Sequence, residues 1–173
     1  MAITRLGGAT AITGTIPQGN IANASLGAVT ALPGAIATGK VLQVVAATDT
    51  QERNTTSTSF VTVDSLLTVN ITPSSTSSKI FVIVSTTTYN ATAAKSSYLS
   101  IYRDSTNLGN AQGFIRNLTA GSAAGSSSTC SILDAPSSTS QITYRVYVRS
   151  DSGGTLYLNA NGIGTITAYE IAG

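Results

Sequence analysis

The side chains with the most chemical potential in this chain are seven carboxylates and a single cysteine, and histidine is absent. Without histidine, neither a Ser-His-Asp triad nor a Cys-His pair can form. Two carboxylates hydrolyse glycosides only when they face each other at a fixed separation. Most of these carboxylates lie in predicted turns or at strand ends, where Asp is common for turn reasons alone, so we predict no enzyme activity. The seven are Asp49, Glu52, Asp64, Asp104, Asp134, Asp151 and Glu170.

The sequence predicts no metal and no cofactor. A calcium site takes roughly six to eight oxygen ligands, and no Asp-rich loop offers them. No phosphate-binding GxxxxGK[ST] segment is present. Cys130, the only cysteine, can form neither an intramolecular disulfide nor a zinc site. It lies in a strand-like run, where we expect it to act as a small buried hydrophobe.

Aromatic and basic side chains form the remaining candidate site. Tyr147 lies between Arg145 and Arg149 at alternate positions of one predicted strand, so all three share a polar face. Arg145, Tyr147 and Arg149 are therefore the candidate contacts with a glycan or a neighbouring subunit. Tyrosine is also favoured in strands for packing alone, and this alternative predicts a structural ladder across the sheet.

The elements that would position these residues are β-strands. Only 9% of the residues are charged, against about 25% in an ordinary soluble domain, and serine and threonine dominate the polar positions. From Lys40 onward the apolar residues recur with a period of two, and turn residues separate short runs. We therefore predict an all-β domain over residues 40–173, an antiparallel β-sandwich or jelly roll. The predicted strands are 41–47, 59–64, 67–72, 79–87 (placed centrally), 98–103, 112–117, 129–133, 141–149, 155–159 and 165–171, with 120–128 as a flexible connection and 151–154 as a hairpin turn.

Residues 1–39 differ in character and are predicted to form an extended, low-complexity N-terminal attachment arm. They carry one charge, Arg5, and Pro17 and Pro33 interrupt any long helix. Whether the stretch 20–32 is helical or extended stays open. The apolar residues of the whole segment 1–39 are too many for a solvated linker, so we expect them to be buried against a partner. The predicted attachment residues are Ile3, Leu6, Ile12, Ile16, Ile21, Leu26 and Leu32.

Charge and hydropathy argue against two classes of partner. The net charge is +2 and the nine Lys and Arg residues are spread along the chain, whereas nucleic-acid binders cluster theirs. No run of about 20 apolar residues exists to insert into a membrane. The N-terminus also lacks an uninterrupted apolar stretch of a signal peptide, so we expect synthesis in a host cytoplasm without general export.

Several segments resemble bacteriophage fibre and virion structural proteins. Segments 14–26 (GTIPQGNIANASL) and 32–45 (LPGAIATGKVLQVV) are similar to the N-terminal and junction segments of tail-fibre and virion structural proteins from marine and freshwater phages. Segments 71–80 (ITPSSTSSKI), 102–106 (YRDST) and 133–136 (LDAP) resemble the β-domain of the same proteins.

The resemblance implies a homotrimer in the virion, attached through its N-terminal segment to capsid or tail proteins, with the β-domain outward. The shortness of the chain favours a capsid decoration protein or short head fibre. The alternative is a tail-fibre receptor-binding or carbohydrate-binding module that contacts a glycan on the host surface.

Overall fold

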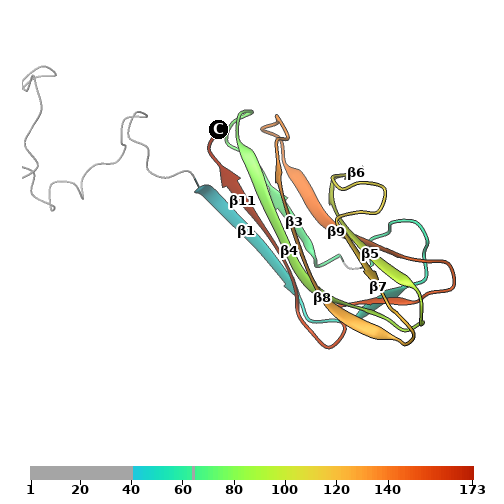
Figure 1. Cartoon of the computed structure of the whole chain (residues 1–173). Coiled ribbons are helices and arrows are strands. Elements are labelled where there is room, and N and C mark those ends of the chain that lie inside the picture. The colour runs from blue at the N-terminus through green and yellow to red at the C-terminus, as the bar shows by residue number, and fades with distance from the viewer. Residues whose placement is uncertain (1–40, 64) are drawn as a thin grey trace, which may run out of the picture. The chain divides into compact units, whose positions relative to one another are not determined.

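The computed structural model describes residues 41–63 and 65–173, so the predicted arm, with its seven attachment residues, and Asp64 lie outside the described residues. The chain divides after Thr38 into two units, and all of the described residues lie in the second, Gly39–Gly173. All its regular elements are strands of two antiparallel sheets, which confirms the all-β prediction (Figure 1). The strands are β1 Val41–Asp49, β2 Arg53–Thr55, β3 Thr68–Ile71, β4 Lys79–Asn90, β5 Ser96–Arg103, β6 Thr106–Asn107, β7 Ile115–Leu118, β8 Ala124–Asp134, β9 Ile142–Ser150, β10 Leu156–Leu158 and β11 Gly164–Ile171.

The first sheet, called sheet A, is built around β4. Strand β8 pairs with β4 along one side, while β11 and β10 pair with successive halves of its other side. Strands β1 and β2 then pair with β11 and β10. The apolar run 79–87 is therefore central, as predicted, because both of its edges are hydrogen-bonded.

The second sheet, sheet B, has β9 and β5 at its centre. Strand β3 pairs with β9 at one edge, and β6 and β7 pair with β5 at the other. Most connections cross from one sheet to the other, so that β1, β4, β8 and β11 lie opposite β3, β5, β7 and β9. The sequence left open a β-sandwich of another kind or a jelly roll. The strand orders β1-β11-β4-β8 and β3-β9-β5-β7 are those of a jelly roll.

Alternation of side chains places the core between the sheets. On β4, Ile80, Val82 and Val84 point inward and are fully buried, while the intervening residues point outward. Strand β9 behaves in the same way, as its period predicted. The buried apolar cluster consists of Leu67, Val69, Ile71, Ile80, Val82, Val84, Leu99, Ile101, Ile142, Tyr144, Val146, Val148, Leu156, Leu158, Ile166 and Ala168.

The inward positions of β4 become polar toward its C-terminal end. Thr86, Thr88 and Asn90 are buried there. The Thr86 hydroxyl donates to Oδ1 of Asn159 at 2.7 Å, and Nδ2 of Asn117 donates to Oγ1 of Thr88 at 3.0 Å. These bonds satisfy polar groups that would otherwise be costly to bury, so this half of the interior is held together largely by hydrogen bonds.

Several sequence predictions differ from the structure. Residues 59–63, the described part of the predicted strand 59–64, form no strand, because only Val61 bridges β9, at Val148. Most of the predicted connection 120–128 is strand, because residues from Ala124 onward pair with the long β4. The turn at 151–154, with Gly153 at φ 75°, joins β9 to β10 in the opposite sheet and so makes no hairpin.

Candidate functional site

The carboxylates that the structure describes do not converge on a common centre. Among the described residues, no group of three or more Cys, Asp and Glu side chains could hold a metal ion. Asp104 accepts a hydrogen bond from the backbone of Thr143 at 3.0 Å, and Asp49 pairs with Arg53 at 3.7 Å. Glu52 is exposed. The three other described carboxylates, Asp134, Asp151 and Glu170, accept hydrogen bonds that join separate strands or loops.

Glu170 joins β11 to the loop between β3 and β4. Its Oε1 accepts hydrogen bonds from both the backbone and the hydroxyl of Ser74 and from the hydroxyl of Ser78, and its Oε2 accepts one from Gln43. The side chain is 1% exposed. Burial raises the pKa of this carboxyl, but the hydrogen bonds from Ser74, Gln43 and Ser78 outweigh it and lower the pKa to about 2.

Asp134 links the two sheets. It ends β8 in sheet A and accepts hydrogen bonds from two residues of sheet B, Arg103 at 2.9 Å and the Tyr144 hydroxyl at 2.6 Å. Burial, together with the neighbouring carboxylate, raises the pKa of Tyr144, which therefore stays protonated and donates. Asp134 therefore holds β8 of sheet A to β5 and β9 of sheet B.

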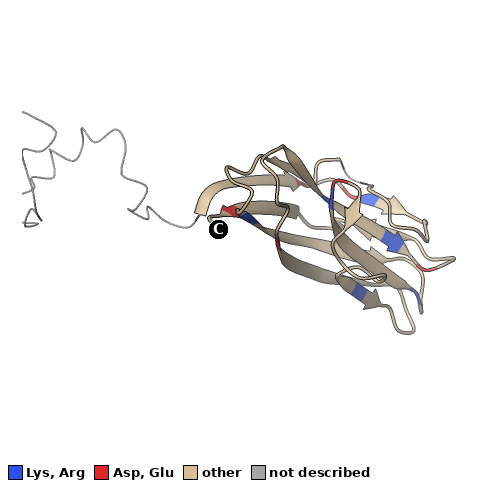
Figure 2. Cartoon of the chain, turned by 90° about the horizontal axis from the view of Figure 1, so that it is seen from above, with Lys and Arg blue, Asp and Glu red and all other residues tan. Residues whose placement is uncertain are grey.

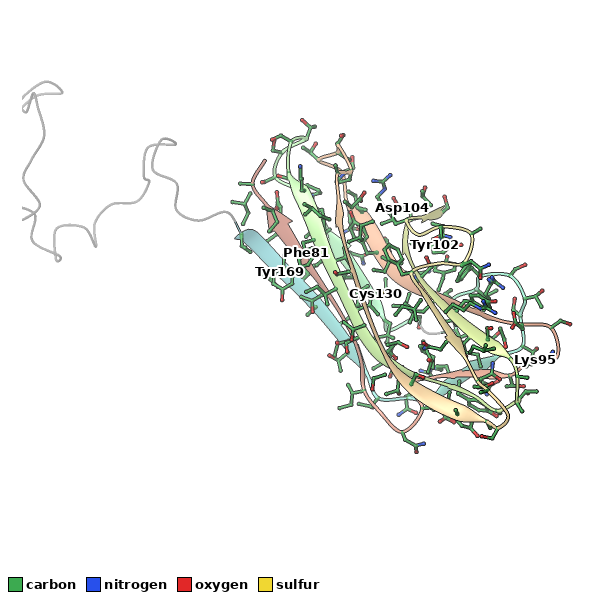
Figure 3. All side chains as sticks on the ribbon, in the orientation of Figure 1. Phe81, Lys95, Tyr102, Asp104, Cys130 and Tyr169 are labelled. Atoms are coloured by element: carbon green, nitrogen blue, oxygen red, sulfur yellow. The ribbon has the colours of Figure 1, made fainter. Side chains whose placement is uncertain are left out.

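Cys130 is half-buried and packs against the apolar core from β8 (Figure 3). Burial raises the pKa of its thiol to about 12, so the reactive thiolate is scarce at neutral pH.

The predicted residues Arg145, Tyr147 and Arg149 do share the outer face of sheet B, but each is engaged there. Tyr147 stacks on Tyr102 with ring centroids 3.9 Å apart. The guanidinium of Arg149 lies 3.6 Å from the ring centroid of Tyr98. Nε of Arg145 donates to the Thr68 hydroxyl at 2.9 Å.

One end of this face is anchored by Asp151. Its carboxylate accepts hydrogen bonds from the Ser96 backbone at 2.8 Å and from the Tyr98 hydroxyl at 3.0 Å. Burial raises the pKa of Asp151, but these hydrogen bonds outweigh it and lower the pKa. Asp151 thus fixes the Tyr98 ring on which Arg149 lies. The contacts across this face have the geometry of a structural ladder.

The outer face of sheet A carries a different feature, a row of apolar side chains across all four of its long strands. Strand register aligns Val44 on β1 with Tyr169 on β11, then Phe81 on β4, then Leu133 on β8. Val44 and Leu133 are 52% and 53% exposed, and the rings of Phe81 and Tyr169 lie side by side (Figure 3). We call these four residues the apolar band.

Charge separates the two outer faces. On the outward positions of β1, β4, β8 and β11 the only charged residue is Lys79, at the end of β4. The outward side of sheet B carries Arg116, Arg145 and Arg149. Figure 2 shows how few coloured segments interrupt the fold as a whole. Removing the outer face of sheet A from water therefore desolvates almost no charge.

Sequence reasoning missed the apolar band, although each of its members lies in a strand that the sequence predicted. Alternation places a residue on a face, but the band depends on the register of four strands from distant parts of the chain. No single-strand pattern contains that information.

No protein-family model matches this chain, and no curated protein matches it significantly. Among the described residues, no helix is long and apolar enough to cross a membrane.

Proposed function

We propose that this chain is a non-enzymatic structural protein of a bacteriophage virion, a capsid decoration protein or short head fibre. In this proposal the jelly-roll domain associates with two further copies, and residues 1–39 attach the trimer to the particle. The apolar band is the observation that carries the proposal. The resemblance to phage fibre and virion proteins supports it independently.

The band is suited to contact with another protein surface. Val44 and Leu133 are each about half exposed, and Val41 and Leu42 extend the apolar surface at the start of β1. Burying the exposed half of one such side chain stabilises an interface by roughly 1 kcal/mol. Contiguous apolar surface of this kind marks interaction sites in soluble proteins.

A second copy of the chain is the occupant that the charges favour. Around a three-fold axis, the part of a face that lies at the axis meets its counterparts from the other two copies, so like charges there would approach one another. The nearly uncharged outer face of sheet A avoids that repulsion, whereas the arginines of sheet B would create it. Contact through sheet A also leaves the arginine-bearing face outward. The number of copies, three, is implied by the resemblance.

The position of the band also suits attachment. β1 begins at Val41, directly after the predicted arm, and Val41, Leu42 and Val44 are its exposed apolar residues. Copies that meet at the band would start their arms close together. A trimer would then present three arms to the capsid at once, which raises the strength of attachment through effective concentration.

The tail-fibre alternative keeps the same anchoring and adds a ligand on the host surface. It gains support only from a surface of the domain that binds a glycan.

The oligomeric state tests the association. Sedimentation of the full chain should give a trimer, and Val44→Lys should shift it to a monomer with an unchanged circular dichroism spectrum. Thr143→Lys, on the outer face of sheet B, is the matched control and should remain trimeric. A full chain that is monomeric before any substitution would overturn the proposed association.

Location in the particle tests the role. Cryo-electron microscopy of particles from the source should show density for this domain on the capsid, while density at the tail would favour the host-recognition alternative. A chain lacking residues 1–39 should fold but no longer join particles. Absence of the full chain from every particle, or full occupancy by the truncated chain, would contradict the proposal.

A further inference from the structure

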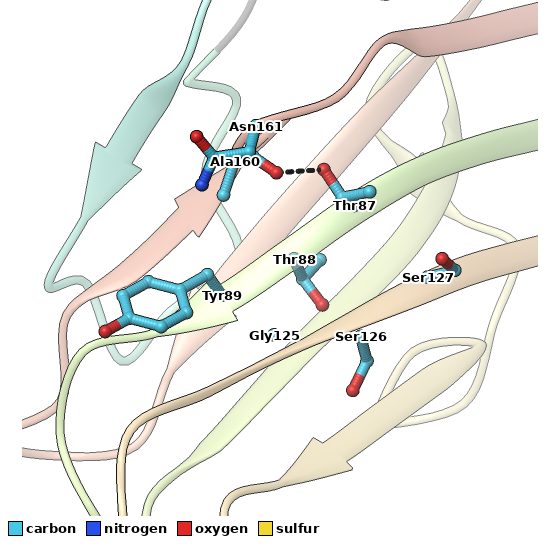
Figure 4. Close-up of a pocket in the computed structure, with 8 residues that line it drawn as sticks. All are labelled: Thr87, Thr88, Tyr89, Gly125, Ser126, Ser127, Ala160 and Asn161. Carbon is cyan, nitrogen blue, oxygen red and sulfur yellow. Dashed lines mark hydrogen bonds between the residues drawn. The ribbon is translucent and has the colours of Figure 1, made fainter.

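Two adjoining hollows lie on the outer face of sheet A at the end of β4 away from the apolar band. One, of about 360 Å³, runs between β4 and β8 (Figure 4), and the other, of about 460 Å³, lies toward β10. Both are lined by Tyr89, Ala160 and Asn161. Their volumes fall within the range of small-molecule sites, about 300–1,000 Å³.

Two tyrosines form the apolar part of this site. Tyr89 on β4 pairs in register with Tyr157 on β10, and their ring centroids lie 5.9 Å apart with the planes tilted by 53°. On the other side of Tyr89 the register partner is Gly125, which has no side chain. A Cβ there would lie 3.7 Å from Cδ2 of Tyr89, so the glycine leaves the flank of that ring uncovered.

Polar groups surround the rings. Glu52 and Asn161 line the hollows, and both are exposed. Ser126 and Ser127 line the β8 side, and Ser127 shares the outer face with Gly125 and Tyr89. Together these residues offer a carboxylate acceptor, an amide that both donates and accepts, and a hydroxyl that does either.

The turn that carries Asn161 is held rigidly. Asn159 and Asn161 have positive φ of 58° and 51°. The backbone N–H of Asn159 donates to the Thr87 carbonyl at 2.8 Å, and the Thr87 hydroxyl donates to the Ala160 carbonyl at 2.8 Å (Figure 4). A turn whose backbone is fixed in advance loses little conformational entropy on binding.

We infer that the hollows around Tyr89 and Tyr157 bind a neutral pyranose unit of a glycan. The carbon-bound hydrogens on one face of a pyranose pack against aromatic rings, while its hydroxyls require mixed donors and acceptors at the rim. Within the part of the chain that the structure describes, no Lys or Arg lines either hollow, and Glu52 in the hollow toward β10 would repel a carboxylate or sulfate, so an acidic sugar is disfavoured.

The site lies at a distance from the apolar band. Phe81 and Tyr89 lie on the same strand and the same face, eight residues apart, which corresponds to about 26 Å of strand. An interface confined to the apolar band would therefore leave the hollows exposed.

The test is a titration of the full ¹⁵N-labelled chain, followed by nuclear magnetic resonance, with the methyl glycosides of glucose, galactose, mannose and N-acetylglucosamine. At least one should shift the Asn161 side-chain amide and the Gly125 backbone amide in a saturable manner with millimolar affinity. Glucuronate should bind more weakly than glucose. If none of the four shifts these signals at roughly 100 mM, the inference is wrong.

Variants locate the binding. Tyr157→Ala should weaken it at least tenfold, and Gly125→Leu should weaken it similarly by filling the hollow while both rings remain. Tyr147→Ala, on the outer face of sheet B, is the matched control and should bind like the parent chain. Unchanged binding in both hollow variants, or loss in Tyr147→Ala alone, would place any sugar site elsewhere and overturn the inference.

Discussion

Ser74 donates two hydrogen bonds to the same carboxylate oxygen of Glu170, one from its backbone N–H at 2.7 Å and one from its hydroxyl at 2.6 Å. The two residues lie 96 positions apart in the chain. Their contact fastens the loop before β4 to the end of β11. Gln43 donates to the same carboxylate from β1, so three segments meet at one buried charge.

The hydrogen bonds to the Glu170 carboxylate make the free energy of unfolding depend on pH in the acidic range. The folded-state pKa of about 2 lies below the ordinary value of 4.5, so the stabilisation is complete above pH 4.5. It is lost as the pH falls from about 4.5 to 2, because protonation removes the charged acceptor. We expect the free energy of unfolding to decrease by up to about 3 kcal/mol over that window, measured by urea titration at a series of pH values.

Glu170→Gln should remove most of that pH dependence and destabilise the domain by about 1–3 kcal/mol at pH 7, since an amide cannot accept all four hydrogen bonds. Glu52→Gln, at an exposed carboxylate, serves as the control and should leave the profile of the parent chain. An unaltered acid profile in Glu170→Gln would show that other carboxylates govern it.

Tyr144→Phe should weaken the connection between the two sheets, and so lower the free energy of unfolding, without creating a cavity. The change removes only the hydroxyl that donates to Asp134, and Asp134 keeps its bond to Arg103. We expect a loss of about 2 kcal/mol, seen as a decrease in melting temperature of roughly 5 °C. Tyr157→Phe, at the surface, should shift stability by less than about 0.5 kcal/mol. Equal effects of the two substitutions would contradict the role assigned to Asp134.

Gly164→Ala should destabilise the start of β11. A Cβ at this buried glycine would overlap Oδ1 of Asn159 and lie 2.8 Å from Cδ1 of Leu67. Relieving that overlap requires both neighbours to move, at a cost of about 1–3 kcal/mol. Gly121→Ala is the control, because nothing lies within 4 Å of its added methyl group. Denaturant midpoints of the two variants should differ clearly, and equal midpoints would mean that the β11 start adapts freely.

Cys130 should react slowly with thiol reagents in the native protein. Its thiol is half-buried and its pKa is raised to about 12, so little thiolate is present at pH 8. Reaction with a chromogenic disulfide should accelerate by at least about a hundredfold in denaturant. Rapid labelling of the folded chain would show that the β8 edge opens readily.

The strands were predictable where one face is buried and the other is exposed. Residues 141–149 alternate cleanly, and the structure has β9 at Ile142–Ser150. Prediction failed where the partner strand, and not the local sequence, determines the conformation. Residues 124–128 (AGSSS) have weak strand propensity, yet they form part of β8 because β4 extends to Asn90 and supplies an unpaired edge.

The candidate sites show the same division. Alternation along β9 correctly placed Arg145, Tyr147 and Arg149 on one outer face. It could not show that Tyr147 would stack on Tyr102, because that contact joins two strands whose register is set elsewhere. The pairing of Tyr89 with Tyr157 was hidden for the same reason.

Composition and period by themselves determined the all-β class and the predominantly hydroxyl surface, since both depend on local residue preferences. Only the tertiary structure decided the jelly-roll strand order, the apolar band and the two hollows beside Tyr89 and Tyr157. Each arises from register between strands far apart in the chain, and register is set by which buried faces pack together across the whole sandwich.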